Sequence, residues 1–168
     1  MGSFFIEGLL RRLAGKATDT DDSGSSAACA AVLQAATVLA VPHTNPDGVS
    51  RGHLRTNAAG ANLNREWAAP NERTSPEILC IRNAMDRIGC DLCLDIHGSE
   101  GIPRVWGTLC TGWTPRLASL CNEFLDGWAR VAGPAFDRDF CNMETSVEDT
   151  NLDVCTAQVG HRFSEWME

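Results

Sequence analysis

The sequence predicts an α/β domain with a partly parallel sheet. Segments with apolar residues at helical spacing alternate with short apolar runs that end in turn residues. Helices that alternate with short buried strands are typical of α/β folds. A chain of 168 residues, 43% of them hydrophobic, is long enough to enclose one core and too short to suggest two. We therefore predict a single domain over residues 1–168.

The first half of the chain is expected to lead from a helix to a long polar loop. Apolar residues at helical spacing predict an amphipathic helix over 3–15, followed by an Asp/Ser-rich loop over 16–28. A helix tail then runs into a buried strand over 37–41. Residues 45–75 are rich in Asn, Gly and Arg, which indicates a long ordered loop of a kind that is uncommon unless it is functional.

The second half is expected to hold two helices and a further strand. Ser75, Pro76 and Glu77 supply an N-cap, a first-turn proline and an acid at the positive end of the helix dipole. Residues 91–98, DLCLDIHG, predict a short buried strand that ends at His97. The apolar face of the first helix comprises Ile78, Ile81, Met85 and Ile88, and Gly89 is expected to end it. Thr114-Pro115 predicts another helix start, with Leu117, Leu120, Phe124 and Trp128 on one face.

The charge and cysteine content narrow the class of protein. A formal net charge of −8 and a pI near 4.9 disfavour a nucleic-acid partner and binding to anionic membranes. No apolar run is long enough to cross a bilayer, and the N-terminus lacks the pattern of an export signal. We therefore predict a cytoplasmic protein whose eight cysteines are reduced. Cys90 and Cys93 form a CxxC, for which core packing is favoured over a redox or zinc knuckle.

His97 is the first candidate for chemistry. It ends a predicted strand in Asp95-Ile96-His97-Gly98, and ligands of open α/β sheets gather beyond the carboxyl ends of strands. A histidine in that place suits a metal ligand or an acid–base group, with Asp95 on the same side of the strand. The alternative is a strand-end histidine that hydrogen bonds to a loop, and the residues alone leave both readings open.

Arg55, Asn64 and Arg65 form a second candidate group. They flank a Gly/Asn segment in the long loop, which begins with the turn sequence Asn45-Pro46-Asp47-Gly48. Two guanidinium groups and an amide suit a carboxylate, because the planar fork of arginine matches two oxygens at once. The alternative is a solvated loop whose arginines pair with surface acids.

The order of these segments resembles the M14 zinc metallocarboxypeptidases. NPDG at 45–48, RTN at 55–57, NLNREW at 62–67 and DIHG at 95–98 follow one another as in that family, and most closely as in cytosolic carboxypeptidases and their bacterial relatives. The resemblance spans nearly the whole chain. It implies a partial metallocarboxypeptidase-like fold, with a mixed, mostly parallel sheet flanked by helices. It also implies zinc as the cofactor and hydrolysis of C-terminal residues from peptides or proteins.

The resemblance assigns roles residue by residue. His97 matches a zinc-binding histidine, and Asn64 and Arg65 match the pair that binds the terminal carboxylate of the substrate. Arg55 matches the arginine that polarises the scissile carbonyl. In this reaction class zinc lowers the pKa of a bound water, a glutamate accepts its proton, and the arginine stabilises the charge on the carbonyl oxygen.

The sequence also departs from the family pattern. The HxxE motif that supplies two zinc ligands would stand just before Met1, and SEWME at 164–168 does not match the strand that carries the general-base glutamate. Although His97 and Glu100 are spaced as HxxE, their position after NREW argues against Glu100 as a ligand. We therefore expect a chain truncated at both ends and inactive as it stands. The alternative is a non-catalytic relative that binds C-terminal carboxylates.

Overall fold

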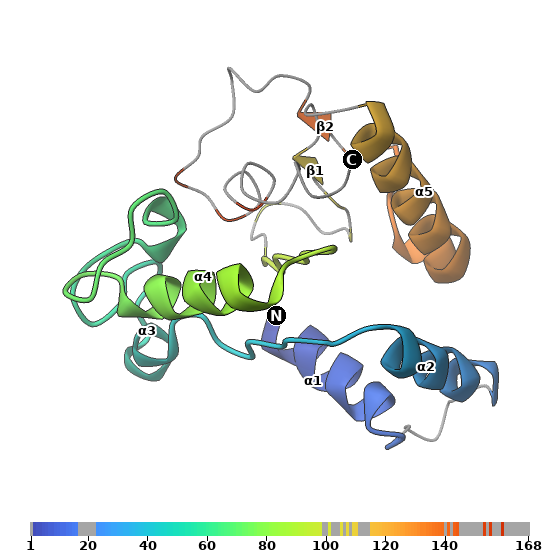
Figure 1. Cartoon of the computed structure of the whole chain (residues 1–168), viewed down its shortest axis with the longest axis horizontal. Helices are drawn as coiled ribbons and strands as arrows, with labels where there is room; N and C mark the ends of the chain where they lie inside the picture. The colour runs from blue at the N-terminus through green and yellow to red at the C-terminus, as the bar shows by residue number, and fades with distance from the viewer. Residues whose placement is uncertain are drawn as a thin grey trace. The chain divides into compact units, whose positions relative to one another are not determined.

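The computed structural model describes residues 2–16, 23–98, 101, 105, 107, 109–110, 115–139, 141, 143–144, 153, 155 and 159. The chain divides into two units, one of Met1–Thr44 with Ile96–Gly98 and one of Asn45–Asp95 with Ser99–Glu168. Figure 1 labels the helices and strands of both units. The single domain expected over residues 1–168 is not tested by this division and stays a prediction.

The first unit consists of two packed helices and extended segments. It contains α1 (Gly2–Leu13) and α2 (Ser23–Ala35), which contact each other along their length. An ion pair of 2.7 Å between Arg11 Nη2 and Glu7 Oε1 joins adjacent turns of α1. Gly15 follows with a φ of 68°, a left-handed conformation that ends the helix. The helix predicted over 3–15 is thus confirmed to within two residues at each end.

The second unit holds the remaining elements. They are α3 (Pro46–Arg51), the 3₁₀ turn η1 (Leu63–Arg65), α4 (Pro76–Ile88), β1 (Leu109–Cys110), α5 (Pro115–Ala132), the 3₁₀ turn η2 (Gly133–Ala135) and β2 (Met143–Glu144). In α4, Pro76 occupies the first turn and the N–H of Gly89 donates to the Met85 carbonyl oxygen at 2.8 Å. The boundaries predicted for this helix are therefore confirmed.

A βαβ arrangement lies in the second unit. β1 and β2 pair in parallel, with Leu109 opposite Met143 and Cys110 opposite Glu144. An isolated parallel bridge joins Val105 to Phe136. Parallel neighbours need a crossover connection, and α5 supplies it between β1 and β2. These described elements are those of an α/β fold.

Two groups of buried side chains hold the second unit together. The first, which we call the loop core, comprises Leu63, Trp67, Ile78, Cys155 and Val159, with Ile81, Met85, Cys90 and Cys93 packed against it. The second lies around α5, where Leu125 is buried and Trp128 stacks on Phe136 with ring centroids 5.0 Å apart. Burying side chains of this size stabilises a fold by about 1.5–3 kcal/mol each.

Neither strand predicted in the first hundred residues is assigned in the structure. Residues 37–41 and 91–97 have no ladder hydrogen bonds to a neighbouring strand within the described part of the chain. The expected burial is wrong for Leu92 and Leu94, whose exposed fractions are 64% and 42%. An apolar run indicates a strand only when a partner covers it, so the pattern alone overstated the local order.

Three other expectations need correction. The loop over 16–28 ends earlier than expected, because α2 begins at Ser23 in a run rich in alanine, the best helix former. Ile88, expected on the buried face of α4, is 52% exposed because it lies in the last turn. In α5 the buried position is Leu125 and not Leu120, which is 46% exposed. The two leucines lie five positions apart, so they point in clearly different directions from the helix.

Candidate carboxylate-binding site

The NPDG segment begins a short helix and not only a turn. Asn45 is the N-cap of α3, and its Oδ1 accepts a hydrogen bond from the Gly48 N–H at 2.9 Å. Pro46 occupies the first helical position, where a missing N–H costs nothing. A Cβ at Gly48 would overlap the Asn45 side chain and so displace the cap from its present position. The same asparagine donates from Nδ2 to the Thr56 carbonyl oxygen at 3.0 Å, which ties α3 to the loop that follows.

The loop that carries Arg55 is closed on itself. Thr56 forms an isolated antiparallel bridge with Asn62. The Thr56 carbonyl oxygen also lies 3.2 Å from His53 Nδ1. Arg55 precedes the bridge and is exposed. Within the described residues its guanidinium makes no hydrogen bond or ion pair.

Asn57 fills the inside of this loop. Its Oδ1 accepts from the N–H groups of Ala59 and Ala61, both at 3.0 Å. Its Nδ2 donates to the Thr74 carbonyl oxygen at 2.9 Å and to both carboxylate oxygens of Glu77 at 3.1 and 3.2 Å. The chain between α3 and α4 thereby folds back against the start of α4 (Figure 1).

The NLNREW segment divides its residues between the core and the surface. Leu63 and Trp67, four positions apart, each keep 5% exposure in the loop core. Asn64, within η1, accepts a hydrogen bond at Oδ1 from the Cys155 N–H at 3.2 Å. Arg65 is exposed, and its Nη1 donates to the Asn64 carbonyl oxygen at 2.6 Å. The apolar pair therefore anchors the turn that presents Asn64 and Arg65.

Helix α4 fixes this turn at two further points. The Ser75 hydroxyl donates to Glu66 Oε2 at 3.1 Å and accepts from the Asn71 N–H, in place of the N-cap bond expected of it. Arg82 Nη1 donates to the Trp67 carbonyl oxygen at 2.7 Å. Helix α4 and the serine before it thus hold the C-terminal end of the NLNREW segment.

The nearby cysteines are neutral packing groups. A hydrogen bond with the Cys93 thiol is the largest cause that raises the pKa of Cys90, and burial adds to it. A hydrogen bond with Cys155 is likewise the largest cause that raises the pKa of Cys93 to about 12. Thiols of this kind are poor nucleophiles at neutral pH, because the thiolate is the attacking form. The CxxC is accordingly part of the loop core.

His97 belongs to the first unit, whereas Arg55, Asn64 and Arg65 belong to the second. The histidine is exposed. No group of three or more His, Cys, Asp or Glu side chains that could hold a metal ion occurs among the residues that the structure describes. A catalytic zinc site needs three protein ligands, so the described residues do not fit a zinc centre by themselves. Glu100 lies outside the described residues.

Known proteins resemble the chain over most of its length. An uncharacterized protein of Zymomonas mobilis is 39% identical over 167 residues, which cover 97% of this chain and 41% of that protein. Cytosolic carboxypeptidase 1 of Xenopus laevis is 30% identical over 165 residues, which cover 86% of this chain and 13% of that protein. No protein-family model matches the chain.

The chain also resembles solved structures of metallo-carboxypeptidases. A metallo-carboxypeptidase from Burkholderia cenocepacia matches with a TM-score of 0.82 and 36% identity, over 96% of this chain and 41% of that one. A metallo-carboxypeptidase from Pseudomonas aeruginosa, in complex with (2-guanidinoethylmercapto)succinic acid, matches with a TM-score of 0.76 and 35% identity, over the same shares. The chain belongs to the M14 carboxypeptidase-like family. It spans 41% of the first relative's length.

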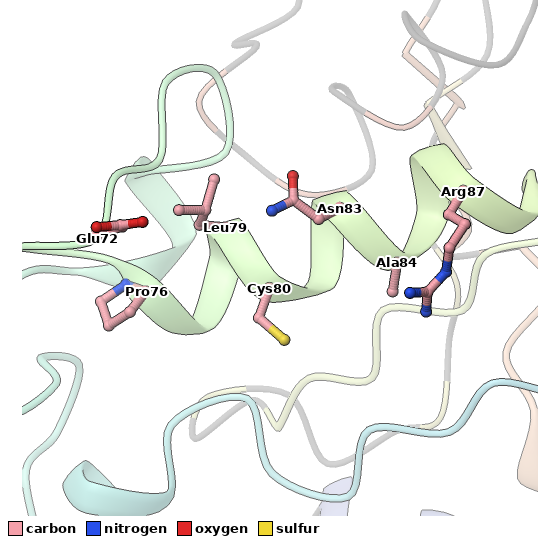
Figure 2. Close-up of a pocket in the computed structure, with 7 residues that line it drawn as sticks. All are labelled: Glu72, Pro76, Leu79, Cys80, Asn83, Ala84 and Arg87. Carbon is pink, nitrogen blue, oxygen red and sulfur yellow. The ribbon is translucent and has the colours of Figure 1, made fainter.

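A hollow on the surface of this carboxypeptidase-family chain lies away from the residues of the candidate site. It has a volume of about 380 Å³ and runs along one face of α4, with Leu79, Cys80 and Asn83 between Glu72 and Arg87 (Figure 2). None of Arg55, Asn64, Arg65 and His97 lines it. No helix of the described residues is both long and apolar enough to cross a membrane.

Sequence reasoning missed the residues that hold the candidate site in place. Asn57, Glu77 and Cys155 contact it or its loop, and none of them was expected to do so, since Glu77 was assigned only to the start of its helix. Their partners are 20 and 91 positions apart in the chain, which no local pattern reveals. A usable signal existed only for Asn57, because an asparagine that follows an Arg-Thr pair inside a Gly-rich loop is suited to closing a turn.

Proposed function

We propose that this chain carries the substrate-carboxylate site of a zinc-dependent metallocarboxypeptidase that hydrolyses C-terminal residues from peptides or proteins. Asn64 and Arg65 bind the terminal carboxylate in this proposal. Arg55 polarises the scissile carbonyl and stabilises the negative charge that develops on its oxygen. His97 is one ligand of the zinc ion.

The observation that carries the proposal is the display of exposed donors on a loop whose backbone is held by hydrogen bonds. Arg55 and Arg65 are exposed, yet the loop between them is closed by backbone and side-chain bonds. Because Asn64 Oδ1 accepts from Cys155, its NH₂ group is the part that remains to donate to a ligand. A loop backbone that is already ordered lowers the entropy cost of binding a carboxylate, so that only the arginine side chains must be immobilised.

The metal and the remaining details belong to the same proposal. Zinc lowers the pKa of a bound water and so supplies the nucleophile in such enzymes. His97 is a single candidate ligand, so the chain by itself binds carboxylates and does not cleave peptides. We further infer a mixed, mostly parallel sheet flanked by helices. A cytoplasmic location is supported by relatives that are named cytosolic carboxypeptidases.

A non-catalytic relative that binds C-terminal carboxylates is the second candidate. The absence of a three-ligand metal group among the described residues favours it. Both candidates require the same carboxylate site, and they differ only in whether zinc-dependent cleavage accompanies binding.

The affinity of the chain for a peptide with a free C-terminus tests the shared requirement. We expect an N-acetylated dipeptide acid to bind the wild-type chain more tightly than its C-terminal amide. Arg65→Ala should reduce that preference by about tenfold or more, because a hydrogen bond to a charged group is worth about 1.5–3 kcal/mol.

Arg87→Ala is the matched control, since Arg87 is an exposed arginine of the same unit and its removal changes the net charge equally. It should leave the preference unchanged. An acid-over-amide preference that survives in Arg65→Ala would rule out the proposed role of Arg65.

A further inference from the structure

We propose that Asn57 is a positioning residue that sets the arrangement of Arg55 with Asn64 and Arg65. This inference rests on the proposed function for what the three residues bind. It goes beyond that function in assigning the arrangement to a residue that touches no substrate.

The location of Asn57 makes it the centre of the loop. It retains only 2% exposure, and its side chain makes five hydrogen bonds that use both its oxygen and its nitrogen. The orientation of the amide is fixed, because the oxygen faces two N–H donors and the nitrogen faces a carbonyl and a carboxylate. A flipped amide would place donor against donor and acceptor against acceptor.

The loop that Asn57 closes connects Arg55 to Asn64 and Arg65. The backbone N–H of Asn57 donates to the Ala61 carbonyl oxygen at 2.9 Å, next to the bridge between Thr56 and Asn62. Residues paired in an antiparallel bridge have Cα atoms roughly 4.5–5.5 Å apart. Arg55 is one residue before this bridge, and Asn64 is two residues after it. The bridge therefore sets the separation of Arg55 from Asn64, and Asn57 supports the bridge through its adjacent hydrogen bonds.

Asn57 also connects this loop to a rigid frame. Its Nδ2 reaches the first turn of α4 at Glu77, next to Ile78, which has no exposed surface. The bond to a carboxylate is charge-assisted and stronger than one between neutral groups. The Arg55–Arg65 segment is therefore held against α4 and not left to move as a free loop.

No other side chain can replace Asn57 fully. Aspartate lacks the donors for Thr74 and Glu77 and places a second negative charge beside Glu77. Alanine lacks both halves of the network. Glutamine carries both groups but is longer by one methylene, which a residue with 2% exposure cannot accommodate without displacing its neighbours.

The test combines Asn57→Asp with a repair at Glu77. Asn57→Asp keeps an acceptor for Ala59 and Ala61 and loses the bonds that Nδ2 donates to Thr74, just before α4, and to Glu77 within it. In Asn57→Asp with Glu77→Gln, the new amide at 77 can donate to the new carboxylate at 57, which restores one bond in reverse. Asn83→Asp makes the same charge change at an exposed position of α4 and serves as the control.

Two measurements are made on each variant of the full chain. The first is backbone hydrogen exchange at Arg65, whose N–H donates to the Asn62 carbonyl oxygen at 2.9 Å. The second is the affinity ratio for the dipeptide acid and its amide. We expect Asn57→Asp to accelerate exchange at Arg65 and to reduce the acid preference by about tenfold, while exchange within α4 stays slow.

The repaired double variant should recover at least half of both losses on a logarithmic scale, and Asn83→Asp should lose neither. Unchanged exchange at Arg65 in a folded Asn57→Asp chain would overturn the proposal. A wild-type chain that does not distinguish acid from amide would instead refute the proposed function. In that case the exchange data alone decide the positioning role, because they need no ligand.

Discussion

At the residue scale, the candidate site depends on two kinds of residue within NLNREW, the buried apolar side chains and the polar side chains between them. Leu63 and Trp67 are buried in the loop core, and this burial fixes the turn from which Asn64 and Arg65 reach solvent. Arg55, Asn64 and Arg65 could be nominated from the sequence because two guanidinium groups and an amide in one loop suit a carboxylate, and their role stays a prediction. Asn57 could not, because its importance comes from Thr74 and Glu77, which fold against it from 17 and 20 positions away.

The raised pKa of Cys93 predicts a loss of stability in alkaline solution. Its pKa rises from 9.0 to about 12, mainly through the hydrogen bond with Cys155, so the folded state favours the neutral thiol. The stabilisation is complete below the unfolded pKa and is lost as the pH rises from that value through the folded one. Urea unfolding should therefore show a midpoint that falls steadily above about pH 9.

Cys93→Ser should flatten this alkaline decline, whatever it does to stability at neutral pH. Cys80→Ser, at an exposed cysteine of the same unit, should leave the decline as it is. An equal decline in wild type and Cys93→Ser would mean that other groups cause it.

At the element scale, α4 is the frame of the candidate site. Its first turn binds Asn57 through Glu77, Ser75 before it binds Glu66, and Arg82 within it binds the Trp67 carbonyl. The helix was predictable because Pro76 and Gly89 mark its ends and its apolar residues recur at helical spacing. The strands predicted over 37–41 and 91–97 are not assigned in the structure, because a strand is completed by a neighbour that the local sequence does not encode.

The end of α4 gives a test of this frame. Gly89 has φ of 82° and ψ of 174°, a conformation that is essentially restricted to glycine. Gly89→Ala should therefore destabilise the chain by roughly 1–3 kcal/mol in urea unfolding. Gly127→Ala in α5 should instead be neutral or stabilising by about 0.5–1 kcal/mol, since alanine is favoured within helices.

The two glycines form a matched pair, because a Cβ at either position would meet no atom within 4 Å. Backbone conformation is thus the only difference between them. Equal effects of the two substitutions would contradict the assigned helix end.

At the scale of the whole molecule, family membership could be recognised from the order of its motifs, whereas the residues that the structure describes do not by themselves assemble a zinc centre. The relatives extend well beyond it, and the described residues hold no three-ligand group. A motif records local chemistry, but a metal centre depends on residues brought together from several segments.

Metal content tests this distinction. We expect the purified chain to retain substoichiometric zinc after dialysis and to show no peptidase activity that a chelator abolishes, because a single histidine binds zinc weakly. His97→Ala should change neither result. Tight binding of one zinc per chain, measured by elemental analysis, would refute the expectation and would show that the chain completes the site by itself.

The central claim is that Arg55, Asn64 and Arg65 form one carboxylate-binding site, and a backbone NMR titration tests it most directly. The chain is titrated with an N-acetylated dipeptide acid and, separately, with its C-terminal amide. Shift changes with the acid should centre on these three residues, with affinity about tenfold or more above that of the amide. Equal affinity for the two ligands, or shifts confined to another surface such as the hollow along α4, would contradict the claim.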